Sequence, residues 1–152
     1  MTDAVWFLDV APRRAFERFG CVPLAFFTST FEYVAGHWIY MLTFVIAIPT
    51  IGARLLRVGF IDRHSGLPSV QLMEAIADPA DPRWSPHRYG DGSLCMWFPD
   101  DPPARRWVPA DGLEALVVYI RAHLVREDWW RRTGEWPGPE APPGALAKAG
   151  SQ

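Results

Sequence analysis

The run from Tyr33 to Ala53 contains no Asp, Glu, Lys or Arg, and this limits what the chain can fold into. About 20 apolar residues are enough for a helix that crosses a membrane. The run also contains Gly36, Pro49 and Gly52, and it is rich in β-branched and aromatic residues. That composition favours buried strands joined by turns over one continuous helix. We therefore expect strands here, and a membrane segment is the less favoured alternative.

The neighbouring segments continue the strand pattern. Short turn signals separate four strand-like segments, residues 24–34, 37–48, 53–62 and 69–75. Successive strands with such short connections pair antiparallel, so the segments predict a four-stranded meander. A weak N-terminal helix is expected before them, beginning at Pro12 or broken by it.

Helical periodicity appears only near the C-terminus. Residues 76–110 are proline-rich but contain many apolar residues, which indicates an ordered loop. Asp111 is a candidate N-cap, and Gly134 ends the helical segment. Apolar residues repeat between these two positions at three- and four-residue spacing: Leu113, Leu116, Val117, Ile120 and Leu124. The predicted fold class is α+β, with C-terminal helices, one domain over residues 1–138 and a flexible tail over 139–152.

Charge and cysteine content narrow the function. The net charge of −2 with interleaved signs offers no basic face, so nucleic acid is not expected as a partner. The only cysteines are Cys21 and Cys95, and the N-terminus has no secretory signal pattern, so we expect a cytoplasmic, reducing location. Cys21 is interpreted as a core residue. No metal-ligand spacing, cofactor motif or nucleotide-binding motif is present, so no cofactor is predicted.

The stretch HRYGDGSLCMW, residues 87–97, is the strongest candidate for a functional site. Cys95 follows a Gly-Asp-Gly turn and stands eight residues after His87. A cysteine between Leu94 and Met96 is, by itself, more often a buried packing residue than a nucleophile. A nucleophilic role requires an accessible thiol on a rigid loop.

The order of elements, together with the spacing of His87, Gly92, Cys95 and Trp107-Val108-Pro109, resembles the ubiquitin-conjugating enzyme family over residues 31–138. Arg88 and Tyr89 stand where that family has Pro and Asn. The charged insertion PDDPPARR and the ending WWRRTGEWPGPE are similar to the bacterial branch found beside anti-phage (CBASS) and ubiquitin-like conjugation operons.

The resemblance implies that Cys95 accepts the C-terminus of a protein as a thioester and passes it to an amine. The implied partners are a separate activating enzyme and, as cargo, a ubiquitin-like protein or a CBASS nucleotidyltransferase. Two alternatives stay open: a catalytically weak binding module of the same fold, and a Cys-dependent thioester hydrolase.

The absence of the family's Asn leaves one role to assign, the donor to the oxyanion of the amide-forming step. We expect His87 and the backbone N–H groups of residues 90–93 to supply it, and the Tyr89 hydroxyl is the other side-chain candidate. Tyr89 is expected to begin the turn and point into the core. Asp91 is interpreted as a turn residue, with a supporting role toward the incoming amine as the alternative.

Overall fold

The computed structural model describes Phe7 and residues 25–62, 68–73, 81–98 and 101–139. The predicted N-terminal helix, Cys21 and all but the first residue of the predicted tail lie outside these residues. The described elements, in chain order, are β1 (Ala25–Val34), β2 (His37–Ile48), β3 (Gly52–Ile61), β4 (Ser69–Leu72), two short 3-10 helices, η2 (Pro103–Arg105) and η3 (Pro109–Asp111), and α2 (Gly112–Thr133).

The four strands form one antiparallel sheet in the order β1-β2-β3-β4, so the predicted meander is confirmed. The β1–β2 connection is a two-residue turn in which Ala35 and Gly36 both have positive φ. This geometry matches the twist of an antiparallel pair. The uncharged run is therefore the end of β1, all of β2 and the start of β3, and the helical alternative is wrong. In the described part of the chain, no helix is long and apolar enough to cross a membrane.

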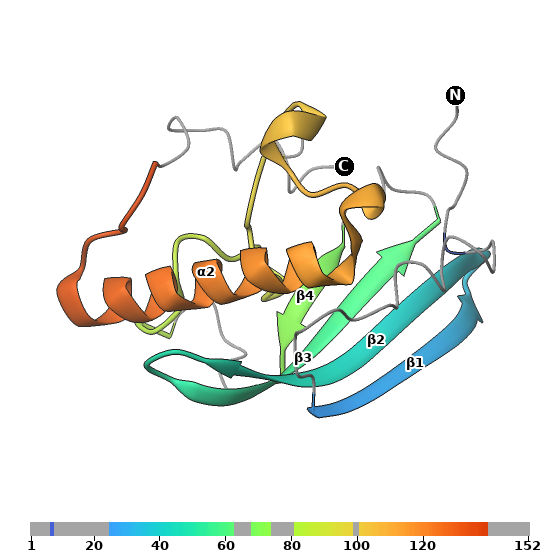
Figure 1. Ribbon diagram of the computed structural model, residues 1–152, viewed down its shortest axis with the longest axis horizontal. Coiled ribbons are helices and arrows are strands. Elements are labelled where there is room, and N and C mark those ends of the chain that lie inside the picture. The colour runs from blue at the N-terminus through green and yellow to red at the C-terminus, as the bar shows by residue number, and fades with distance from the viewer. Residues whose placement is uncertain (1–6, 8–24, 63–67, 74–80, 99–100, 140–152) are drawn as a thin grey trace.

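Helix α2 lies across one face of the sheet (Figure 1). In place of the predicted C-terminal helices the described residues contain this single α-helix. Gly134 ends it in the left-handed conformation, with its N–H bonded to the Trp130 carbonyl, as predicted. Asp111 precedes the helix but makes no side-chain cap on it. Its carboxylate instead accepts the Val108 N–H at 2.9 Å and closes η3.

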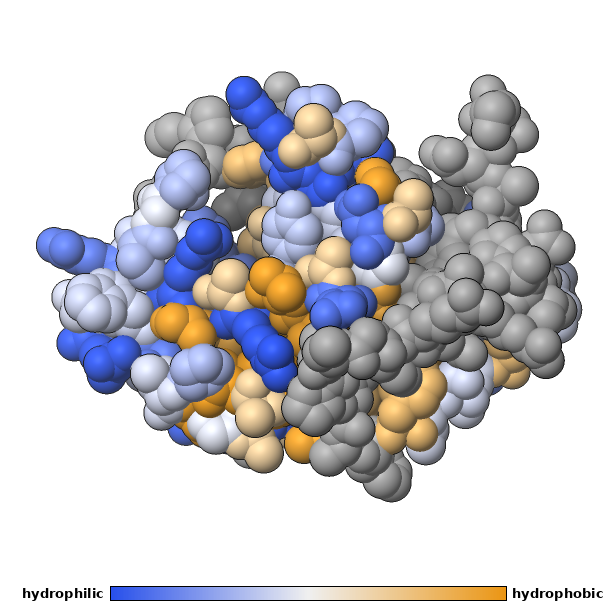
Figure 2. Space-filling view, viewed as in Figure 1, coloured by the Kyte–Doolittle hydropathy of each residue, from blue (hydrophilic) through white to orange (hydrophobic). Residues whose placement is uncertain are grey.

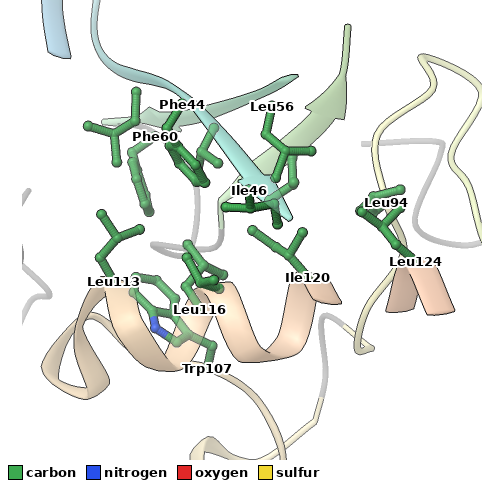
Figure 3. Packing of buried hydrophobic residues seen from close by; sticks show 14 of the residues in the cluster. Phe44, Ile46, Leu56, Phe60, Leu94, Trp107, Leu113, Leu116, Ile120 and Leu124 are labelled. Atoms are coloured by element: carbon green, nitrogen blue, oxygen red, sulfur yellow. The ribbon is translucent and has the colours of Figure 1, made fainter. Parts of the chain in front are cut away.

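The hydrophobic core lies between α2 and the sheet. Alternate residues of β2 are buried, as the two-residue period of a strand requires: Tyr40, Leu42, Phe44, Ile46 and Ile48. Figure 3 shows Leu113, Leu116 and Ile120 of α2 directed toward this layer. Trp107 is fully buried, and its indole N–H donates to the Gly112 carbonyl at 2.8 Å. That bond holds the segment before the helix against the core.

The outer surface of α2 carries both charged and apolar residues. On the face shown in Figure 2, hydrophobic residues are interspersed with hydrophilic ones. The large apolar side chains that α2 exposes are Val118, Tyr119 and Trp129. The helix therefore buries one side in the core and leaves a mixed surface on the other.

Candidate active site

A short hairpin, residues 87–95, carries the candidate nucleophile. Arg88 and Leu94 form an antiparallel bridge. The Cys95 N–H donates to the His87 carbonyl, and the Tyr89 N–H donates to the Ser93 carbonyl, both at 2.9 Å. The eight-residue interval between His87 and Cys95 is thus the length of a closed hairpin.

The turn of this hairpin explains the Gly-Asp-Gly sequence. The Gly92 N–H donates to the Tyr89 carbonyl at 2.8 Å, and Gly92 has φ of +85°, a conformation that favours glycine. The Asp91 carboxylate accepts the backbone N–H of Ser93 at 2.9 Å and its hydroxyl at 2.6 Å. Asp91 therefore has the local hydrogen bonds of a turn residue.

The hairpin alternates between an inner and an outer side. Leu94 belongs to the hydrophobic core, and its N–H donates to the Val70 carbonyl of β4 at 2.8 Å. Arg88, its bridge partner, also points inward. Since side chains alternate along a strand, His87, Tyr89, Ser93 and Cys95 share the other side.

Arg88 joins the hairpin to α2. Its guanidinium forms two hydrogen bonds of 2.7 Å to the two carboxylate oxygens of Glu127, and the two side chains are only 2% and 1% exposed. Arg131 Nη2 lies 3.2 Å from the same carboxylate. A bidentate, desolvated pair of this kind fixes both distance and orientation. The residue that stands in place of the family's proline therefore holds the loop on the helix.

Cys95 is only 8% exposed, whereas a nucleophilic role requires an accessible thiol. The thiol lies 3.9 Å from its hydrogen-bond acceptor, the Trp97 carbonyl, and it interacts with the side chain of Tyr89. Burial raises the pKa of the Cys95 thiol, and the interaction with Tyr89 acts in the opposite direction. At neutral pH the thiol is therefore largely protonated.

The side chain of Tyr89 was expected to point into the core; the register of the hairpin puts it on the same side as Cys95, and it interacts with the Cys95 thiol. The physical reason is the hairpin alternation, which puts both side chains on one side. Burial raises the pKa of Tyr89 above its ordinary value, and the interaction with Cys95 raises it further. The hydroxyl therefore keeps its proton and is a donor throughout the physiological range.

His87 is braced by its backbone and by its ring. The backbone N–H donates to Ser85 Oγ at 3.0 Å, and the imidazole stacks on Trp136 with ring centroids 3.9 Å apart. Behind it, His123 is buried, with its centroid 5.3 Å from the Trp136 ring, and its Nε2 has no hydrogen-bond partner among the described residues. The segment after α2 thus packs on the active-site hairpin.

Two of these contacts escaped the sequence analysis. Glu127 lies on the same face of α2 as the apolar residues Leu116, Ile120 and Leu124, and a charge on that face is a sign of a buried partner. The contact of Trp136 with His87 left no such sign, since a tryptophan after a helix packs in many ways. The described residues contain no cluster of three or more His, Cys, Asp or Glu that could hold a metal.

The four-stranded meander, the C-terminal helix across one face and the thiol on a hairpin bonded to β4 and α2 are consistent with the ubiquitin-conjugating fold. The model of the family described as Type II CBASS E2 protein matches residues 43–143. The chain therefore belongs to this family of bacterial ubiquitin-conjugating-like proteins from CBASS anti-phage operons. Comparison with curated proteins and with solved structures gave no match.

Proposed function

We propose that Cys95 carries the C-terminal acyl group of another protein as a thioester and transfers it to an amine within CBASS anti-phage defence. Family membership supports the defence role and the conjugating class. The observation that carries the assignment to Cys95 is its place on a hairpin that is bonded to both β4 and α2. Such a hairpin holds the thiol on a rigid loop, as a nucleophilic role requires.

The reaction has two balanced steps. In loading, the Cys95 thiolate attacks the thioester carbonyl on an activating enzyme, a new C–S bond forms at Cys95, and the activating enzyme's sulfur leaves as thiolate. In discharge, an amine attacks the same carbonyl, an amide bond forms, and the Cys95 thiolate leaves. The amine loses one proton, which the departing thiolate or solvent takes up. The chain then returns to its starting state.

The site favours a carrier of thioesters over a thioester hydrolase. Hydrolysis by a cysteine enzyme needs a base that takes a proton from the thiol or from water. Tyr89 interacts with the Cys95 thiol, and burial raises the pKa of the Tyr89 hydroxyl, so Tyr89 cannot serve as that base.

The test is a loading assay with the cognate activating enzyme, ATP and each candidate cargo, a ubiquitin-like protein or a CBASS nucleotidyltransferase. Neighbouring genes identify which cargo to use. We expect an adduct that a reductant removes, that Cys95→Ala abolishes and that Cys21→Ala leaves intact.

Three other results would separate the alternatives. An adduct lost in Cys21→Ala but kept in Cys95→Ala would refute the assignment. A burst of adduct followed by rapid hydrolysis would indicate the hydrolase. Noncovalent binding of the cargo without any adduct would indicate the binding module.

A further inference from the structure

We propose that Tyr89 is a catalytic residue whose hydroxyl stabilises negative charge at the reacting centre, first on the Cys95 sulfur and then on the oxyanion of the transferred acyl group. This inference rests on the proposed function of Cys95. It gives Tyr89 the role that we had expected for His87 with the backbone of the turn.

The geometry starts from the hairpin. His87 pairs with Cys95, and Tyr89 pairs with Ser93, on either side of the Arg88–Leu94 bridge. Tyr89 and Cys95 are therefore diagonal neighbours on one side of a two-stranded segment, within reach of a long aromatic side chain. Their side chains interact, and this interaction contributes to the raised pKa of Tyr89.

The position of Tyr89 is fixed before any substrate arrives. Its N–H donates to the Ser93 carbonyl at 2.9 Å, and its carbonyl accepts the Gly92 N–H at 2.8 Å. The preceding residue, Arg88, is held by Glu127 through two short hydrogen bonds. A donor fixed in this way needs no reorganisation when charge develops, which is the condition for efficient electrostatic stabilisation.

The chemistry uses the hydroxyl twice. In the free protein it donates to the sulfur and favours the thiolate, which is the form that attacks. After loading, the carbonyl oxygen is two bonds from the sulfur, so a small rotation of the Tyr89 ring brings the hydroxyl to that oxygen. When the amine attacks, the C=O electron pair moves onto the oxygen and receives the O–H hydrogen bond. Tyr89 keeps its proton throughout. When the Cys95 sulfur departs, it replaces the oxyanion as the acceptor of the Tyr89 O–H hydrogen bond.

The first experiment measures the Cys95 thiol alone, in the full chain with Cys21→Ala. The rate of alkylation by iodoacetamide is followed against pH in this background, in Tyr89→Phe and in Tyr33→Phe. We expect Tyr89→Phe to raise the pKa of Cys95, since it removes an interaction that lowers that pKa. Tyr33 is 62% exposed on β1, so Tyr33→Phe is the matched control and should leave the profile unchanged. An unchanged pKa in Tyr89→Phe would overturn the proposal.

The second experiment measures discharge. Protein loaded by the activating enzyme is separated from ATP and mixed with lysine or hydroxylamine. We expect Tyr89→Phe to form the adduct but discharge it about 100-fold more slowly, the usual effect of losing one oxyanion donor. His87→Ala should slow discharge much less. Discharge by Tyr89→Phe at the wild-type rate, or slowing confined to His87→Ala, would overturn the proposal.

These experiments separate the failure of this inference from failure of the proposed function. If the wild-type chain forms no adduct with any cargo, the proposed function fails, and the alkylation profile still decides whether Tyr89 acts on Cys95. If an adduct forms and Tyr89→Phe behaves as the wild type, only the inference fails. A thermal melt of Tyr89→Phe close to that of Tyr33→Phe shows that the hairpin is intact.

Discussion

We expect the buried ion pair between Arg88 and Glu127 to be one of the strongest interactions that hold the active-site hairpin on α2. Glu127→Ala removes the carboxylate and leaves the Arg88 guanidinium buried at 2% exposure, with its two 2.7 Å bonds lost. Removing one partner of a buried ion pair typically destabilises a protein by about 3–5 kcal/mol. For a chain of this size each kcal/mol lowers Tm by about 2–4 °C, so we expect Tm to fall by about 10 °C.

The assay is thermal and urea denaturation, monitored by circular dichroism, together with alkylation of Cys95 in native buffer. Because the pair holds the hairpin on α2, Glu127→Ala should also increase the rate at which iodoacetamide reaches the Cys95 thiol. The double variant Arg88→Met/Glu127→Leu, which leaves no charge behind, should recover at least half of the lost stability.

Asp128→Ala is the matched control. Asp128 is the next residue of α2, and its pair with Arg132 is 2.9 Å long but lies on the surface, with Arg132 56% exposed. Exposed pairs contribute about 1 kcal/mol or less. If Glu127→Ala were no more destabilising than Asp128→Ala, the argument that burial makes this pair important would be refuted.

Three further predictions concern the same region. Gly92→Ala should destabilise the protein by about 1–2 kcal/mol in urea denaturation, since it forces a side chain into a left-handed backbone with φ of +85°; an unchanged midpoint would contradict the turn geometry. Burial lowers the pKa of His123 from 6.5 to about 4, so the unfolded chain binds a proton there that the folded protein does not, and stability should fall by up to about 3 kcal/mol as pH drops from about 6.5 to about 4. His123→Gln should lose this part of the pH dependence, and a profile identical to wild type would refute it. Trp136→Ala should remove the stack on His87 and lower stability by about 1 kcal/mol, and an NMR titration should then show the pKa of His123 moving back toward 6.5; an unmoved titration would show that Trp136 does not cover that ring.

Local patterns in the sequence were enough to predict the sheet and the helix. Alternation along β2 and short turns such as Ala35-Gly36 predict neighbouring antiparallel strands, because each strand pairs with the next one in the chain. The spacing of Leu113, Leu116 and Ile120 predicts the buried face of α2 in the same way. These features depend on residues close in sequence. The spacing of His87 and Cys95 likewise corresponds to the length of the hairpin, and it indicated the Cys95 thiol as a candidate nucleophile.

Only the tertiary structure decided which side chain meets the sulfur and what holds the loop. Tyr89 and His87 are both close to Cys95 along the chain, and no local pattern says which of them has its polar group on the thiol. The inward turn of Arg88, which depends on Glu127, 39 residues away on α2, puts both side chains on the Cys95 side, and the stack on Trp136 then holds the His87 ring. A contact of that range arises only when the helix packs on the sheet, because it balances desolvation of two charges against their mutual attraction in one geometry.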